Sequence, residues 1–192
     1  MLFKRKTYHN LSDEELMRFL INDGDDRAFE LLYDRYSGKL HSYFYRMLYQ
    51  DQNKADDFTQ DLFMKIVERP EMFDPNRRFS TWLYSVAGNM CKNEYRRNGR
   101  YQIVNEVPEN PIPECFEYIP EPIDRALFEQ QLQQAVNELE ETQKQCFILR
   151  YQEGLSVKEI ANVVDCPEGT VKSRLFYTVR KLSDKLKIFQ YS

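Results

Sequence analysis

The sequence predicts an all-α protein with two small helical domains, residues 1–100 and 124–192, joined by an acidic, proline-rich linker over residues 101–123. The chain has 192 residues and only 6 glycines, but 13 tyrosines and 13 phenylalanines, enough apolar material for two modest cores. Apolar residues recur at helical intervals, and no alternating run predicts a strand. The linker has no Lys or Arg, five glutamates and five of the eight prolines, which favours an extended path.

Helical periodicity predicts four helices in the first domain, at residues 12–21, 27–48, 54–69 and 80–98. The second carries an apolar and aromatic stripe, which we interpret as core because aromatic residues at helical spacing are usually buried. The stripe consists of Phe29, Leu32, Tyr36, Leu40, Tyr43 and Met47.

The third helix is two-faced. Its expected buried side consists of Phe58, Leu62, Phe63, Ile66 and Val67. The opposite side is expected to be exposed and consists of Asp57, Gln60, Asp61, Met64 and Glu68. Paired carboxylates can hold a metal or move protons, but no histidine is in reach, so we interpret this side as a solvated or partner-binding surface.

The fourth helix and the loop before it favour nucleic acid. At about 100° per residue, one stripe of the helix carries amides and basic groups suited to phosphates and base edges. The stripe consists of Ser85, Asn89, Lys92, Asn93, Arg96 and Arg100. The loop 73–79 (FDPNRRF) combines aromatic rings with Asn76, Arg77 and Arg78, a composition able to hold an unstacked base. Asp74 and Pro75 are expected to serve the geometry of a turn.

The second domain contains a helix-turn-helix pattern over residues 155–181. Ser156 and Glu159 form a capping box at the start of its first helix. Pro167 ends that helix and suits the first turn of the next one, whose Val171, Leu175 and Val179 are expected to face the core. The polar residues near the start of this second helix fit a major-groove reader. The predicted duplex-contact set is Glu168, Thr170, Lys172, Ser173, Arg174 and Tyr177.

Charge and cysteine content narrow the function further. The net charge is -4, but basic residues gather at 77–100 and 170–187, so local charge favours DNA where the total would not. The four cysteines lie far apart without metal-ligand spacing, and the sequence predicts no metal, no cofactor and no catalytic residues. The polar N-terminus predicts no signal peptide, and we expect a reduced, cytoplasmic protein.

Residues 139–186, with EIA, GTVKSRL and KL, resemble the fourth region of bacterial sigma-70-family sigma factors. In the first domain, DDFTQDLFMKI and FSTWLYSVAGNMCKNEYRR resemble the second region of the same family, in its small extracytoplasmic-function (ECF) branch. Together the two resemblances cover about residues 28–100 and 125–186. One departure is Cys166, which is expected at the cap position before Pro167, where relatives commonly carry a good cap.

The resemblance implies a sigma factor whose partners are core RNA polymerase and promoter DNA. The third helix would bind the clamp helices of the largest polymerase subunit through Asp57, Gln60, Asp61 and Met64. The second domain would meet the flap of the second-largest subunit and read the minus-thirty-five element through the duplex-contact set. An anti-sigma factor is a further implied partner, and no small-molecule substrate is implied. The implied minus-ten set is Asn76, Arg77, Arg78, Phe79, Ser85, Asn89, Lys92, Asn93, Arg96 and Arg97.

Two other functions are compatible with parts of the pattern. A conventional helix-turn-helix regulator would bind its DNA site without polymerase, and a protein-interaction adaptor would leave the basic stripe of the fourth helix without a role. The acidic linker is either a passive tether or a mimic of nucleic acid that shields a basic surface.

Overall fold

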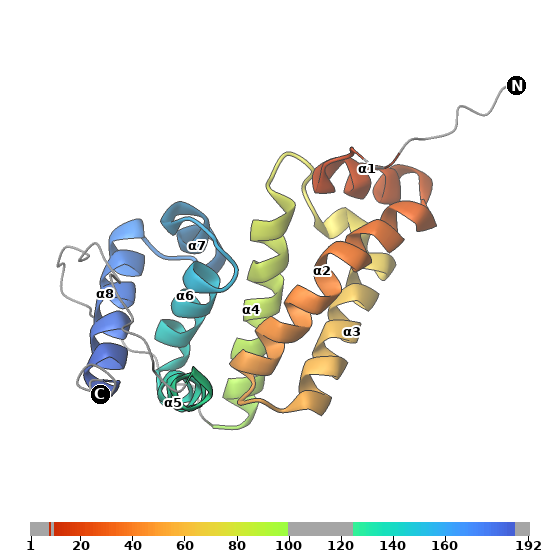
Figure 1. The fold of residues 1–192 in the computed structure, drawn as a ribbon. Helices are drawn as coiled ribbons and strands as arrows, with labels where there is room; N and C mark the ends of the chain where they lie inside the picture. Colours follow the sequence, from red (N-terminus) through yellow and green to blue (C-terminus); the bar gives the residue numbers. More distant parts are fainter. Residues whose placement is uncertain (1–7, 9, 100–124, 187–192) are drawn as a thin grey trace, which may run out of the picture. The chain divides into compact units, whose positions relative to one another are not determined.

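The computed structural model describes residue 8, residues 10–99 and residues 125–186. These residues form eight α-helices and one short 3-10 helix, with no strand among them, as the all-α prediction requires (Figure 1). The chain divides into two compact units, Met1–Cys91 and Lys92–Ser192. The predicted linker, 101–123, lies outside the described residues, and the predicted domain boundaries remain predictions. No helix among the described residues has the length and apolar character needed to cross a membrane.

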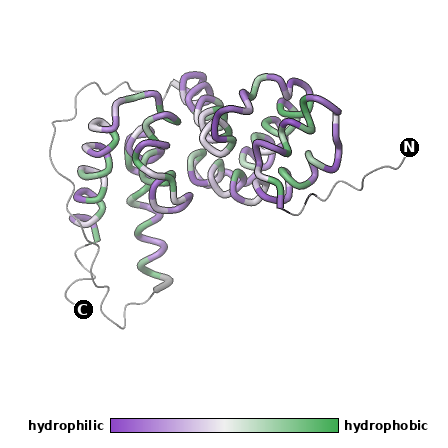
Figure 2. Tube along the Cα trace, turned by 90° about the horizontal axis from the view of Figure 1, so that it is seen from above, coloured by the Kyte–Doolittle hydropathy of each residue, from purple (hydrophilic) through white to green (hydrophobic). Residues whose placement is uncertain are grey.

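Short polar side chains start the first two helices. In α1 (Asp13–Asp23), Ser12 and Glu15 form a capping box, and Gly24 ends the helix at a φ of 60°. In α2 (Asp26–Met47), the Asp25 carboxylate accepts two backbone N–H groups of the first turn. Most of the predicted α2 stripe is buried, Phe29 only partly. Hydrophobic and hydrophilic segments alternate along the helices (Figure 2), as expected for helices with one buried face.

The third helix, α3 (Gln52–Glu68), is followed by the 3-10 helix η1 (Pro70–Met72) and by α4 (Phe79–Arg97). Leu62, Phe63 and Ile66 of α3 are buried as predicted. The prediction for Val67 was wrong, because its side chain is 47% exposed. Val67 lies at the edge of the apolar arc of α3, one turn after the buried Phe63.

The second unit contains α5 (Arg125–Asn137), α6 (Glu141–Tyr151), α7 (Val157–Val164) and α8 (Glu168–Lys185). The predicted capping box of Ser156 and Glu159 is present at the start of α7. The core includes a cluster that joins α5 and α6 to Leu182 near the end of α8. In α8, Val171 and Leu175 are buried as predicted, whereas Val179 is half-buried and Thr178 takes the core position.

The turn between α7 and α8 differs from the prediction by one residue. Asp165 takes the left-handed conformation at a φ of 53°, and Pro167, not Cys166, is the N-cap residue of α8. The Pro167 carbonyl accepts the N–H of Val171 at 3.2 Å. Because proline has no capping side chain, α8 begins without a side-chain cap, and Cys166 lies one residue outside the cap position.

Candidate polymerase and nucleic-acid interfaces

The predicted polymerase-contact residues of α3 share one exposed face. Asp57, Gln60, Asp61 and Met64 are all exposed, with Met64 at 59%. Sequence reasoning missed Tyr33 of α2, which is 43% exposed and whose ring centroid lies 4.7 Å from that of Phe63. The α3 surface is defined here as Tyr33, Asp57, Gln60, Asp61, Met64 and Val67. It includes the exposed side chains of Tyr33 and Met64, residue types that are enriched at protein interfaces, beside two carboxylates.

The loop between η1 and α4 is a turn built by Asp74. Its Oδ1 accepts the backbone N–H and the side-chain Nδ2 of Asn76, both at 3.0 Å, and its carbonyl accepts the N–H of Arg77 at 2.9 Å. Asp74 therefore has the turn role that the sequence suggested. Asn76, Arg77 and Arg78 are all exposed. The turn presents an amide and two guanidinium groups to solvent within three consecutive residues.

The structure contradicts a contact between the Phe79 ring and a DNA base. Phe79 is 0% exposed, and its ring packs edge-on against Tyr36 and Phe73, at centroid distances of 5.3 and 5.4 Å. The Trp82 ring centroid lies 5.8 Å away. A ring enclosed in this way cannot stack on a base, so Phe79 belongs to the core. The composition of the loop could not distinguish an exposed aromatic residue from a buried one.

The polar stripe of α4 is largely accessible. Asn89, Asn93, Arg96 and Arg97 are exposed, and Ser85 and Lys92 are half-buried. Arg97 lies 3.7 Å from the carboxylate of Glu94. Arg100 of the predicted stripe lies outside the described residues. The stripe offers amides and guanidinium groups on successive turns of one helix.

The predicted duplex-contact residues of α8 differ in exposure. Glu168 and Lys172 are exposed, while Thr170, Arg174 and Tyr177 are half-buried. Ser173 is only 2% exposed, so its contact with DNA stays a prediction that this conformation does not favour. The Arg174 Nη1 donates a hydrogen bond to Cys166 Sγ at 3.6 Å, which ties the side chain to the turn before α8.

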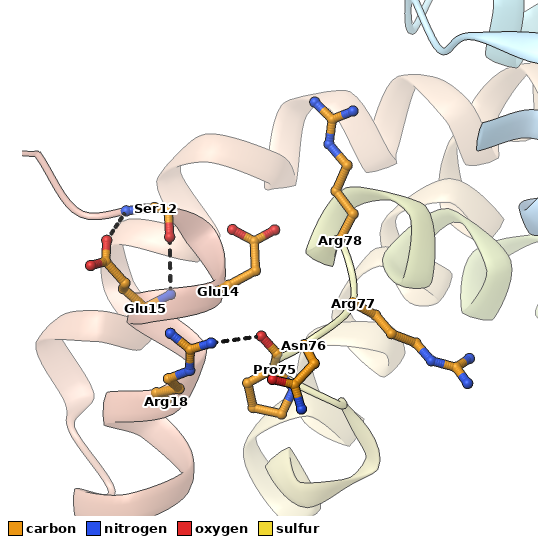
Figure 3. Close-up of a pocket in the computed structure, with 8 residues that line it drawn as sticks. All are labelled: Ser12, Glu14, Glu15, Arg18, Pro75, Asn76, Arg77 and Arg78. Atoms are coloured by element: carbon orange, nitrogen blue, oxygen red, sulfur yellow. Dashed lines mark hydrogen bonds between the residues drawn. The ribbon is translucent and has the colours of Figure 1, made fainter. Parts of the chain in front are cut away.

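Two further polar residues lie beside the loop, and sequence reasoning missed both. Glu14 and Arg18 of α1 line an open hollow together with the loop residues Asn76, Arg77 and Arg78 (Figure 3). The two α1 residues are separated from the loop by about sixty positions in the chain, so no local pattern could reveal the contact. Among the described residues, no group of three His, Cys, Asp or Glu side chains is arranged to hold a metal ion.

Comparison with known proteins places both units in one family. Residues 32–101 match the family model described as Sigma-70 region 2, and residues 129–182 match Sigma-70, region 4. The chain is 31% identical over 191 residues to the ECF RNA polymerase sigma-E factor of Haemophilus influenzae, covering 92% of this chain and 96% of that protein. It is 33% identical over 183 residues to the RNA polymerase sigma-H factor of Pseudomonas aeruginosa, covering 90% of this chain and 92% of that protein.

A solved structure shares the fold. The sigma factor RpoE of Bartonella quintana, in complex with the anti-sigma factor NepR, aligns with a TM-score of 0.63 and 23% identity. The alignment covers 83% of this chain and 97% of that one. The two family matches occur in the order expected from the motifs. They agree with the identity to relatives over nearly the whole chain. The chain belongs to the sigma-70 family of RNA polymerase sigma factors, in its extracytoplasmic-function subfamily, and it directs transcription initiation.

Proposed function

We propose that the two units of this sigma factor divide promoter recognition. In this proposal α3 binds core polymerase, and the loop 74–78 together with α4 captures melted DNA. The helix α8 reads duplex DNA. The α3 surface would dock on the clamp helices of the largest polymerase subunit. Its exposed Met64 and Val67 supply apolar area, and Asp57 and Asp61 supply charge that fixes orientation. The action proposed is binding without bond chemistry, in the cytoplasm where the polymerase works.

The loop and the α4 stripe would act on the minus-ten element. An exposed amide at Asn76 can pair with the edge of an extruded base, and Arg77 and Arg78 can neutralise phosphates. The exposed Asn89, Asn93 and Arg96 would continue the path along the strand. Trapping extruded bases would offset the few kcal/mol that each unstacked base costs.

The start of α8 would enter the major groove at the minus-thirty-five element. Arg174 is the candidate for a base edge because a guanidinium can pair with guanine O6 and N7. Lys172 is exposed and is the candidate for a phosphate. The second unit would also meet the flap of the second-largest polymerase subunit. An anti-sigma partner is proposed as well, supported by the similar fold of the sigma factor RpoE that was solved in complex with NepR.

The observation that carries this proposal is the loop, because Asp74 fixes its turn while Asn76, Arg77 and Arg78 all remain exposed. The test is transcription by reconstituted holoenzyme from a closed promoter and from the same promoter with a pre-melted bubble. Asn76→Ala should reduce initiation on both templates, since capture of a base is needed on each. Asn22→Ala, an exposed asparagine of α1, is the matched control. Full activity of Asn76→Ala on both templates would show that the loop is only a turn.

A further inference from the structure

The helix α1 holds both ends of the loop that carries Asn76. Glu14 Oε1 accepts the backbone N–H of Phe79 at 2.9 Å, at the end of the loop. Arg18 Nη2 donates to the backbone carbonyl of Pro75 at 3.0 Å, near its start. Figure 3 shows Glu14 and Arg18 on successive turns of α1, facing the loop. The Sigma-70 region 2 match begins at residue 32, so α1 lies outside it.

The helix is itself anchored, so these contacts hold the loop to a fixed support. Asp13 Oδ1 pairs with Arg35 Nη1 at 2.5 Å, and the Tyr36 hydroxyl donates to Asp13 Oδ2 at 2.5 Å. Leu16 and Met17 are 0% exposed in the core of the unit. Burial and the bond to Asp13 raise the pKa of Tyr36, which keeps its hydroxyl protonated as the donor at neutral pH. The loop is therefore fastened to α2 through α1.

The Glu14 carboxylate accepts a backbone N–H at the start of α4 that the helix itself leaves unpaired. Phe79 is the first residue of α4, and the Arg78 carbonyl accepts the first helical bond, from Trp82 at 3.2 Å. The N–H of Phe79 therefore has no partner within the helix. A carboxylate satisfies it from another helix and also complements the positive end of the helix dipole. Arg18 likewise donates a hydrogen bond to the Pro75 carbonyl, which lies in the loop before the helix.

We propose that Glu14 and Arg18 are positioning residues that fix the conformation of the loop 74–78, so that α1 sets base selectivity at the minus-ten element without touching DNA. This inference rests on the proposed function of the loop. Base selection requires an amide held in one geometry, whereas phosphate attraction by Arg77 and Arg78 tolerates movement. Loosening the loop should therefore lower selectivity more than total affinity.

The test uses holoenzyme and a pool of single-stranded oligonucleotides with randomised sequence, and bound molecules are sequenced. Glu14→Ala and Arg18→Ala should each lower enrichment of the preferred base at one position by about tenfold, the scale of one lost base-edge contact. Total binding of the pool and its salt dependence should stay within about twofold of wild type, because phosphate contacts remain. Glu14→Gln should retain selectivity, since an amide oxygen still accepts the Phe79 N–H.

The matched controls are Glu30→Ala and Arg27→Ala, which remove an exposed carboxylate and guanidinium that pair with each other on α2. Both should behave as wild type. If Glu14→Gln fails as fully as Glu14→Ala, or if Arg18→Ala flattens the salt dependence as a lost phosphate contact would, the positioning role is overturned. If the wild-type holoenzyme enriches no base, the proposed function of the loop fails. If wild type selects a base and both alanine variants select it equally, only the role of α1 fails.

Discussion

The guanidinium of Arg174 donates a hydrogen bond to the thiol sulfur of Cys166 at 3.6 Å, across the turn of the helix-turn-helix. Burial raises the pKa of Cys166, so the sulfur is a neutral thiol at physiological pH. A neutral sulfur is a weak acceptor, and the contact orients Arg174 without the strong attraction of an ion pair. Under the proposed function, Arg174 would exchange this partner for a guanine edge at small cost.

Arg174→Ala should weaken binding of holoenzyme to its preferred upstream duplex by about 1 to 3 kcal/mol and relax selectivity at one base pair. Lys172→Ala should weaken binding to all duplexes alike and reduce the salt slope by about one. Titrations with preferred and scrambled duplex at several salt concentrations measure both effects. Identical behaviour of the two variants on both duplexes would refute this division of roles.

Alkylation should separate the cysteines by environment. Burial raises the pKa of Cys146 to about 12 and raises that of Cys166 from its ordinary value, so both are protonated at neutral pH. Because the thiolate is the nucleophile, iodoacetamide should modify half-buried Cys166 slowly at pH 7 and faster as the pH rises, while buried Cys146 stays unmodified in the folded chain. Peptide mass spectrometry follows each site. Rapid modification of Cys166 at pH 7 would contradict the raised pKa.

Adding positive charge to the α3 surface should impair polymerase binding. The double substitution Gln60→Lys and Asp61→Lys should weaken affinity for core polymerase at least about tenfold, because both side chains are exposed on the proposed interface. Circular dichroism should stay unchanged. The control Asp34→Lys reverses an exposed charge on α2 outside the α3 surface. Wild-type affinity of the double variant would exclude this surface as the docking site.

Phe79 should act on stability and not on DNA contact. Phe79→Ala should lower the free energy of unfolding of the first unit by about 3 to 5 kcal/mol, since it empties a fully buried site. Phe79→Leu should cost less than Phe79→Ala, because an aliphatic side chain fills part of the site, and it should keep single-strand binding. Urea unfolding followed by the fluorescence of the chain's single tryptophan, Trp82, reports on this site directly. Loss of single-strand binding in a stable Phe79→Leu variant would instead indicate that the Phe79 ring contacts DNA.

Helical periodicity correctly predicted which residues are buried or exposed where the apolar and polar faces of a helix are clearly separated. It placed Asp57, Gln60, Asp61 and Met64 correctly on the exposed side of α3, but not Val67, which lies at the edge of the apolar arc. The capping box predicted the start of α7, because its bonds are local in the chain.

The sequence patterns could not predict contacts between segments that are distant in the chain. Phe79 lies three residues after Asn76 in a stretch that mixes aromatic and polar residues, and only packing against Tyr36 shows that the ring is core. The bond from Phe79 to Glu14 joins positions 65 residues apart, and no spacing rule predicts it. The loop contacts of Glu14 and Arg18 could therefore be identified only from the three-dimensional structure.

Photo-crosslinking in the open complex tests the division of promoter recognition most directly. A photoreactive amino acid replaces Asn76 in one variant and Lys172 in another, and the linked nucleotides are mapped on both DNA strands. We predict that position 76 links to a melted minus-ten nucleotide and position 172 to upstream duplex. Linkage of position 76 only to duplex DNA, or of position 172 only to the melted strand, would contradict the account.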